Sequence, residues 1–290
     1  MLTARLQTLT WQSPEGPKSL AYRQWGEADN PHILLCVHGL TRNSADFHTL
    51  AQTLGKSVRL VAPDMPGRGQ SDWLANAQLY ALPTYVSACM ALIAELRPSQ
   101  LDWLGTSMGG LIGIGYASLP PSIAPHPVRK LILNDVGPSL NLQALERIAY
   151  YVGTKPRFNS QQDARNAIRA DSQTFGPHTE EQWNALCDAV LMQEQGQWTR
   201  QHDPAIGEAF KHMDEATLLA NETALWAAYD AIQADTLVIR GEQSDLLSVQ
   251  TLGLMSKRGP QARTLEIKGV GHAPTLMQLD QIQVVHDFLF

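Results

Sequence analysis

The chain has 290 residues, 44% of them hydrophobic and 17% charged, which is enough apolar material for one domain with an insertion or for two small domains. Its formal net charge of -6 and the absence of a Lys/Arg cluster argue against nucleic-acid binding, and an acidic surface suits anionic membranes poorly. The three cysteines, Cys36, Cys89 and Cys187, lie far apart in apolar or helical segments, so we expect them to be buried thiols rather than disulfides or metal ligands.

The first part of the chain alternates strand and helix patterns. Residues 5–12 and 20–25 alternate apolar and polar side chains around a turn, which predicts a strand pair. Continuous apolar runs predict buried strands at 32–39, 57–64, 101–106 and 128–135, and helices are expected at 44–54, 79–96 and 111–117. This order predicts an α/β protein with a mostly parallel sheet and helices on both of its faces.

The pattern changes after Pro138. Residues 140–218 carry no strand signal, and they show helical patterns at 142–152, 161–174 and 180–191. Strand and helix patterns then alternate again, with helices at 219–232, 249–257 and 275–290 and strands at 235–241 and 263–268. We therefore predict a core of residues 1–138 and 219–290 and a helical cap, or lid, of residues 139–218.

One pentapeptide contains a candidate nucleophile. Gly105-Thr-Ser-Met-Gly109 has the pattern Gly-x-Ser-x-Gly between a predicted strand and a predicted helix, which is the setting that a nucleophilic serine requires. The alternative interpretation is a strand-to-helix turn that contains a serine by chance. The strand–helix setting favours Ser107 as a nucleophile.

A serine hydroxyl needs a base, and that base needs an acid to orient it. His272 lies in a glycine-rich turn after the last predicted strand, where it can reach the ends of the other strands. Two aspartates follow strand ends, Asp245 and Asp135. We favour Asp245 because it directly precedes the strand that leads to the histidine, and we expect Asp135 to anchor the start of the insertion.

The oxyanion of an ester-cleavage intermediate needs fixed hydrogen-bond donors. We expect the backbone N–H groups of Met108 and Leu40 to form this oxyanion hole, with Gly39 letting the loop turn inward and His38 bracing it. The alternative for residues 38–41 is a plain strand-to-loop turn. No His, Cys, Asp and Glu cluster has the spacing of a metal site, and no glycine-rich stretch completes a phosphate-binding motif.

These motifs together resemble the α/β-hydrolase superfamily. They are His38-Gly-Leu40, Asp64-Met-Pro-Gly-Arg-Gly-Gln-Ser-Asp72, Gly105-Thr-Ser-Met-Gly-Gly110, Gly241-Glu-Gln-Ser-Asp245 and Gly271-His-Ala-Pro274. The resemblance implies an eight-stranded sheet, a helical cap over the site and a Ser–His–Asp catalytic triad that needs no cofactor. A serine at position 107 argues against the dehalogenase and epoxide hydrolase branches, which have an aspartate there.

Within the superfamily we expect a carboxylesterase that acts on small to medium esters. Enol-lactonases and perhydrolases share the core motifs, whereas Thr106 and the segment around Asp245 depart from the carbon–carbon bond hydrolases. A ligand-binding protein without catalysis is a further alternative.

The expected partner is a small-molecule ester, with no nucleic acid and no membrane, and monomer and dimer both stay open. Residues 1–10 alternate like a strand rather than a signal peptide, and no apolar run could span a bilayer, so we expect a cytoplasmic protein. Four cap aromatics are the first candidates for lining the pocket, unless the cap is instead a docking surface with outward-facing aromatics. They are Tyr150, Tyr151, Phe158 and Trp183.

Overall fold

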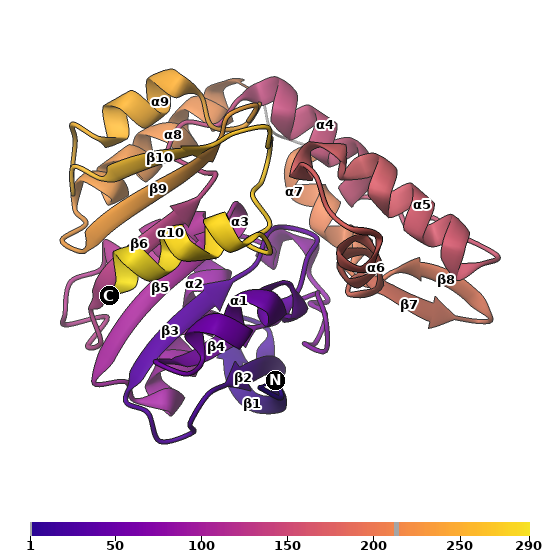
Figure 1. The fold of residues 1–290 in the computed structure, drawn as a ribbon, viewed down its shortest axis with the longest axis horizontal. Helices are drawn as coiled ribbons and strands as arrows, with labels where there is room; N and C mark the ends of the chain where they lie inside the picture. The colour runs from indigo at the N-terminus through magenta and orange to yellow at the C-terminus, as the bar shows by residue number, and fades with distance from the viewer. Residues whose placement is uncertain (1, 212–214) are drawn as a thin grey trace.

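The computed structural model describes residues 2–211 and 215–290, without the side chains of residues 146, 150, 209 and 211. Its main element is an eight-stranded sheet with the strand order β1-β2-β4-β3-β5-β6-β9-β10 (Figure 1). Pairing is parallel from β4 through β10 and antiparallel between β1 and β2 and between β2 and β4. The strands are β1 Arg5–Ser13, β2 Gly16–Trp25, β3 His32–Val37, β4 Arg59–Pro63, β5 Gln100–Thr106, β6 Val128–Asn134, β9 Asp235–Gly241 and β10 Arg263–Ile267. The predicted eight-stranded, mostly parallel sheet is confirmed.

Helices cover both faces of this sheet. One apolar cluster joins the sheet to α2, α3, α8 and α9, and a second joins the opposite face to α1 and α10. The core helices are α1 His48–Leu54, α2 Leu82–Leu96, α3 Met108–Ala117, α8 Glu215–Asp230, α9 Val249–Met255 and α10 Leu279–Leu289. Short 3-10 turns, η1 Ser44–Phe47 and η2 Ala77–Leu79, precede α1 and α2.

Strand β3 shows why the central strands are continuously apolar. Successive side chains of a strand point to opposite faces of the sheet. Leu35 and Val37 accordingly pack in the first cluster, whereas Leu34 and Cys36 pack in the second. Because helices cover both faces, the buried positions 33–37 are all apolar, whereas His32 at the start of the strand is only half-buried.

The segment between β6 and α8 projects beyond one side of the sheet (Figure 1). It contains α4 Leu142–Val152, α5 Gln161–Asp171, η3 Gln173–Phe175, α6 Glu180–Asp188, β7 Leu191–Glu194, β8 Gln197–Arg200, η4 Pro204–Gly207 and α7 Glu208–Lys211. A small apolar cluster of its own, which includes Ile168, Trp183 and Leu186, holds α5, α6 and β7 together. We call this segment, residues 139–211 as described, the cap.

The expectation that the cap contains no strand is wrong. β7 and β8 form an antiparallel hairpin in which Glu194 pairs with Gln197, leaving a two-residue turn. Gln195 and Gly196 in this turn have φ angles of 53° and 79°, the positive values that a type I′ hairpin turn requires. The strands are four residues each and rich in Gln and Glu, so their alternation was too short to separate from the preceding helical pattern.

Two other sequence expectations concern burial and membrane spanning. Cys36, Cys89 and Cys187 are buried free thiols, and burial raises the pKa of each. Within the described residues, every helix is too short or too polar to cross a bilayer.

The first turn of α3 packs unusually close to the ends of β3 and β5. A Cβ atom added at Gly109 would overlap the backbone carbonyl of Val37, and one added at Gly105 would overlap the carbonyl of Gly109. Backbone atoms cannot move aside as a flexible side chain can. Glycine is therefore required at both ends of the pentapeptide by packing alone.

We expect Gly109→Ala to lower the free energy of unfolding by about 2–4 kcal/mol, because the added methyl group meets backbone. Gly253→Ala in α9 is the matched control, since its Cβ would meet nothing within 4 Å, and it should be neutral or stabilise by up to about 1 kcal/mol. Urea unfolding of both variants checks this. Equal midpoints for Gly109→Ala and the wild type would contradict it.

Candidate active site

Three neighbouring strands bring the candidate groups to one edge of the sheet. The register pairs Val37 with Gly105 and Thr106 with Asn134, so the next residues of β3, β5 and β6 emerge side by side. The N–H of Ser107 donates to the carbonyl of Asn134 at 2.9 Å, which fixes the spacing between the ends of β5 and β6.

Ser107 occupies a strained turn between β5 and α3. Its backbone angles are φ 52° and ψ -117°, a conformation that residues other than glycine rarely adopt. Met108 is the first residue of α3, so its N–H has no acceptor within the helix and lies beside the serine at the positive end of the helix dipole. The turn thus combines a nucleophile with a donor for negative charge.

His272 links Ser107 to a carboxylate. Its Nε2 lies 2.9 Å from the Oγ of Ser107, and its Nδ1 lies 2.7 Å from Oδ2 of Asp135. A carboxylate can only accept, so Nδ1 carries the proton and donates it to Asp135, while Nε2 accepts from the serine hydroxyl. This tautomer is the one in which the imidazole can take the serine proton.

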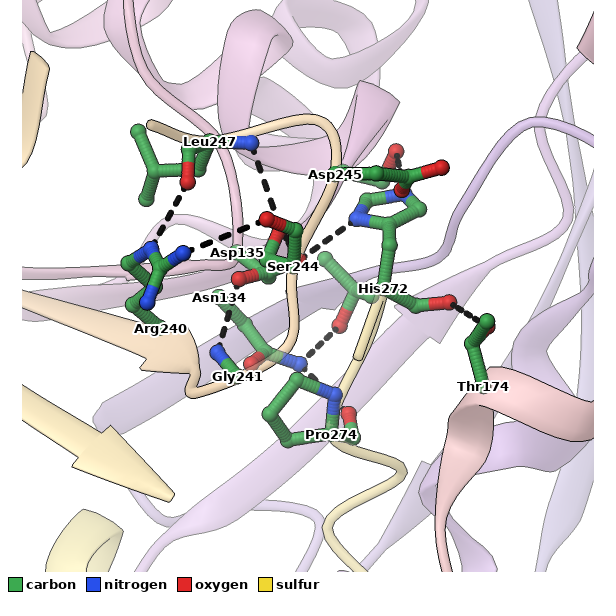
Figure 2. A network of polar contacts seen from close by, with 12 residues as sticks. Asn134, Asp135, Thr174, Arg240, Gly241, Ser244, Asp245, Leu247, His272 and Pro274 are labelled. Atoms are coloured by element: carbon green, nitrogen blue, oxygen red, sulfur yellow. Dashed lines mark hydrogen bonds and ion pairs between the residues drawn. The ribbon is translucent and has the colours of Figure 1, made fainter. Parts of the chain in front are cut away.

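The carboxylate of Asp135 is fully buried at the end of β6. It accepts three hydrogen bonds: from the N–H of Gly241 at 2.8 Å, from the hydroxyl of Ser244 at 2.7 Å, and from His272 (Figure 2). Asp135 also has a positive φ of 57°, and its own N–H donates to Ile239. These bonds compensate the charge of a carboxylate that has no contact with water.

The prediction that Asp245 orients the histidine is therefore wrong. The side chain of Asp245 is 45% exposed and forms an ion pair with Arg147 of α4, 2.6 Å from Nη2 to Oδ2. Asp135 does more than anchor the insertion, since it contacts His272 directly.

The loop after β9 explains why Asp245 points away from the histidine. Buried Arg240 donates from Nε to the carbonyl of Leu247 at 2.7 Å and from Nη2 to the carbonyl of Ser244 at 3.2 Å (Figure 2). Held in this way, the loop turns the hydroxyl of Ser244 inward toward Asp135. The next side chain, Asp245, then lies on the outside and faces the cap.

The loop after β3 lies against the serine. A Cβ added at Gly39 would be 3.8 Å from the Cβ of Ser107, so any side chain there would narrow the space above the nucleophile. Arg68 donates from Nε to the carbonyl of Leu40 at 2.7 Å, and His38 bonds the carbonyl of Gly39, whose peptide unit carries the N–H of Leu40 on its opposite side. The N–H of Leu40 remains a candidate donor for an oxyanion.

His38 holds this loop to the next strand. Its Nδ1–H donates to the carbonyl of Gly39 at 2.7 Å, and its Nε2 accepts from the N–H of Met65 at 2.9 Å. Burial lowers the pKa of His38 to about 4, so the ring is neutral near pH 7. A neutral ring is what this donor–acceptor pair requires.

A pocket opens above Ser107 between the core and the cap. The core contributes the residues of the β3 loop together with Thr106, Ser107, His272 and Ala273. The cap contributes Arg147, Ile148, Tyr151, Ile168, Asp171, Ser172, Thr174, Phe175, Val190, Arg200 and His202. Most of the cap side chains in this set are apolar or basic.

The four cap aromatics expected at the pocket separate into three cases. Tyr151 lines it, together with Phe175. Trp183 and Phe158 pack in the apolar cluster of the cap instead. The side chain of Tyr150 lies outside the described residues.

Thr174, which sequence reasoning missed, joins the cap to the histidine loop. Its hydroxyl donates to the carbonyl of His272 at 2.7 Å (Figure 2). Its carbonyl accepts from the N–H of Gly271 at 2.6 Å. No sequence signal marks it, because a threonine in a polar helical segment is ordinary. Among the residues that the structure describes, no group of three His, Cys, Asp or Glu side chains could hold a metal ion.

Comparison with known proteins agrees with this geometry. Residues 32–276 match the family model described as alpha/beta hydrolase fold. The 3-hydroxybutyrate-oligomer hydrolase of Cupriavidus necator is 45% identical, covering 95% of this chain and 94% of that protein. The pimeloyl-[acyl-carrier protein] methyl ester esterase of Xanthomonas campestris is 26% identical, covering 88% and 94%.

Among solved structures, an alpha/beta hydrolase of Novosphingobium aromaticivorans superposes with a TM-score of 0.83 at 31% identity, covering 99% of each chain. The family match spans most of the chain, and the relatives are matched over nearly their whole length. This chain therefore belongs to the α/β-hydrolase fold family and is a hydrolase.

Proposed function

We propose that the protein is a serine hydrolase that cleaves carboxylic esters through an acyl-enzyme, with Ser107, His272 and Asp135 as its catalytic triad. The observation that carries this proposal is the hydrogen-bonded series from the Ser107 hydroxyl through the imidazole to the buried carboxylate, at 2.9 and 2.7 Å. Each group has the environment that its role requires.

In the first half of the reaction, Ser107 attacks the ester carbonyl while His272 takes the hydroxyl proton. Asp135 keeps the ring in the tautomer that can accept this proton and stabilises the imidazolium that forms. The N–H groups of Met108 and Leu40 donate to the oxyanion of the tetrahedral intermediate. The intermediate collapses, and the alcohol leaves with the proton from His272.

In the second half, water replaces the alcohol. His272 removes a proton from the water as it attacks the acyl carbonyl, and the acid is released when Ser107 recovers its proton from the histidine. Every proton thus passes through one ring nitrogen, Nε2. Nδ1 must therefore keep its hydrogen bond to Asp135 throughout the reaction.

We further propose short linear oligomers of a hydroxy acid, such as 3-hydroxybutyrate, as the substrate class. The support is the 45% identity to the 3-hydroxybutyrate-oligomer hydrolase over almost the whole of both chains. A pocket between the core and the cap, lined in part by Ile148, Tyr151 and Ile168, suits a short aliphatic chain.

Reaction with a fluorophosphonate probe tests the nucleophile. The wild type should be labelled within minutes, and peptide mass spectrometry should locate the label at Ser107. Ser107→Ala should not be labelled, and its turnover should fall by about 10⁴-fold or more. A wild type that stays unlabelled would favour a ligand-binding protein.

The acid is tested by two matched amide substitutions. Asp135→Asn should lower kcat by about 10³–10⁴-fold, because an amide favours the wrong imidazole tautomer. Asp245→Asn should change kcat by less than about threefold, since a surface ion pair contributes little. Steady-state kinetics on a chromogenic ester give both values, and the reverse order would restore Asp245 as the acid.

The substrate class is tested by comparing the 3-hydroxybutyrate dimer and trimer with a lactone of similar size. We expect monomer to accumulate from the linear esters, and kcat/KM for them to exceed that for the lactone by at least about tenfold, as chromatography of the products would show. A faster lactone reaction would point to the lactonase branch.

A further inference from the structure

Three arginines line the pocket above Ser107, against one aspartate: Arg42, Arg147, Arg200 and Asp171. A cation is an unusual lining group in a pocket for neutral esters. A neutral substrate displaces water from the cation but brings no negative charge to replace it. His202, which also lines the pocket, adds no charge near pH 7. Burial lowers its pKa to about 4, and its ring lies 3.0 Å from the carbonyl of Val152.

Two of the three arginines each hydrogen-bond an aspartate through both Nε and Nη2. Arg42 directs Nε and Nη2 at Asp46, at 2.8 and 2.5 Å. Arg147 directs Nε and Nη2 at Asp245, at 3.1 and 2.6 Å. The same pattern recurs away from the pocket, where Arg165 contacts Asp188 through Nε and Nη2 at 2.7 and 2.6 Å.

Arg200 differs from these pairs. It lies at the end of β8 and is only 7% exposed, and its Nη2 forms an ion pair with Asp171. Its Nε is buried and has no acceptor among the described residues. An unsatisfied donor on a buried cation is costly, so this guanidinium retains capacity for one more acceptor.

The surroundings of Arg200 favour a flat anionic group. The guanidinium carbon lies 5.7 Å from the centre of the Tyr151 ring, which also lines the pocket. Asp171 is 38% exposed, so its carboxylate can move toward solvent when a second anion approaches. A guanidinium presents its N–H groups in one plane, which matches the two oxygens of a carboxylate.

We propose that Arg200 binds a free carboxylate of the substrate and so makes the enzyme selective for ester acids. This inference rests on the proposed function. In a linear hydroxy-acid oligomer the free carboxylate belongs to the unit that leaves as the alcohol. Arg200 therefore lies on the side of the pocket that binds the leaving alcohol unit. Its contact with the free carboxylate sets which ester bond, counted from that end of the oligomer, is cleaved.

Two dimers that differ in one group test this selectivity. The first is the linear 3-hydroxybutyrate dimer with a free carboxylate, and the second is the same dimer capped as a primary amide. We expect the wild type to show a ratio of kcat/KM, acid over amide, of about 10–100, the usual strength of a charge-assisted hydrogen bond. A ratio near one would overturn the proposal.

The ratio should fall to about three or less in Arg200→Gln. Arg165→Gln is the matched control, because it removes an arginine–aspartate pair of the cap that does not line the pocket, and it should keep the wild-type ratio. Arg200→Gln that keeps the wild-type ratio, or Arg147→Gln that lowers it more than Arg200→Gln does, would contradict the assignment to Arg200.

A measurement on the wild type alone covers the case in which Arg200→Gln fails to fold. Butyrate should inhibit hydrolysis of a neutral chromogenic ester competitively, with an inhibition constant at least about tenfold below that of butyramide. Equal inhibition would refute the carboxylate site while leaving the esterase intact. A wild type that cleaves no ester, neutral or acidic, would refute the proposed function and this inference with it.

Discussion

The buried carboxylate of Asp135 is the constraint on which the site depends. A carboxylate that is buried away from water needs several hydrogen-bond donors. Here three segments supply them: Gly241 at the end of β9, Ser244 in the next loop, and His272 in the loop after β10. One side chain thus holds together parts of the chain more than 100 residues apart. If the carboxylate were removed, each of these donors would lose its acceptor, and the orientation of the imidazole would no longer be fixed.

The regular parts of this arrangement could be predicted from sequence because they follow from local rules. Continuous apolar runs marked the central strands, and the two glycines around Ser107 marked the turn at the end of β5. Asp135 and Asp245 both follow strand ends, so sequence position could not separate them. The difference comes from the bonds of Arg240, which set the conformation of the loop and turn Ser244 rather than Asp245 inward. Hydrogen bonds from a side chain to the backbone of a loop leave no periodic signal in the sequence.

The cap was predicted less well than the core for a related reason. Its helices were visible in the sequence, but the β7–β8 hairpin was missed because four-residue strands are too short for periodicity. That hairpin carries Arg200 to the pocket that Gly39 and Leu40 also line. The sheet is rigid and holds the reacting groups. The cap has an apolar cluster of its own, so its pocket-lining side chains can be substituted without displacing the reacting groups.

The two hydrogen bonds of Thr174 have a consequence for how substrate enters and product leaves. They attach η3 of the cap to Gly271 and to His272, so the base and the roof of the pocket share one support. A hinge motion that lifted η3 away from the core would pull on the histidine loop as well. Any opening of the pocket at η3 would therefore have to break these two bonds or displace the loop that carries the base.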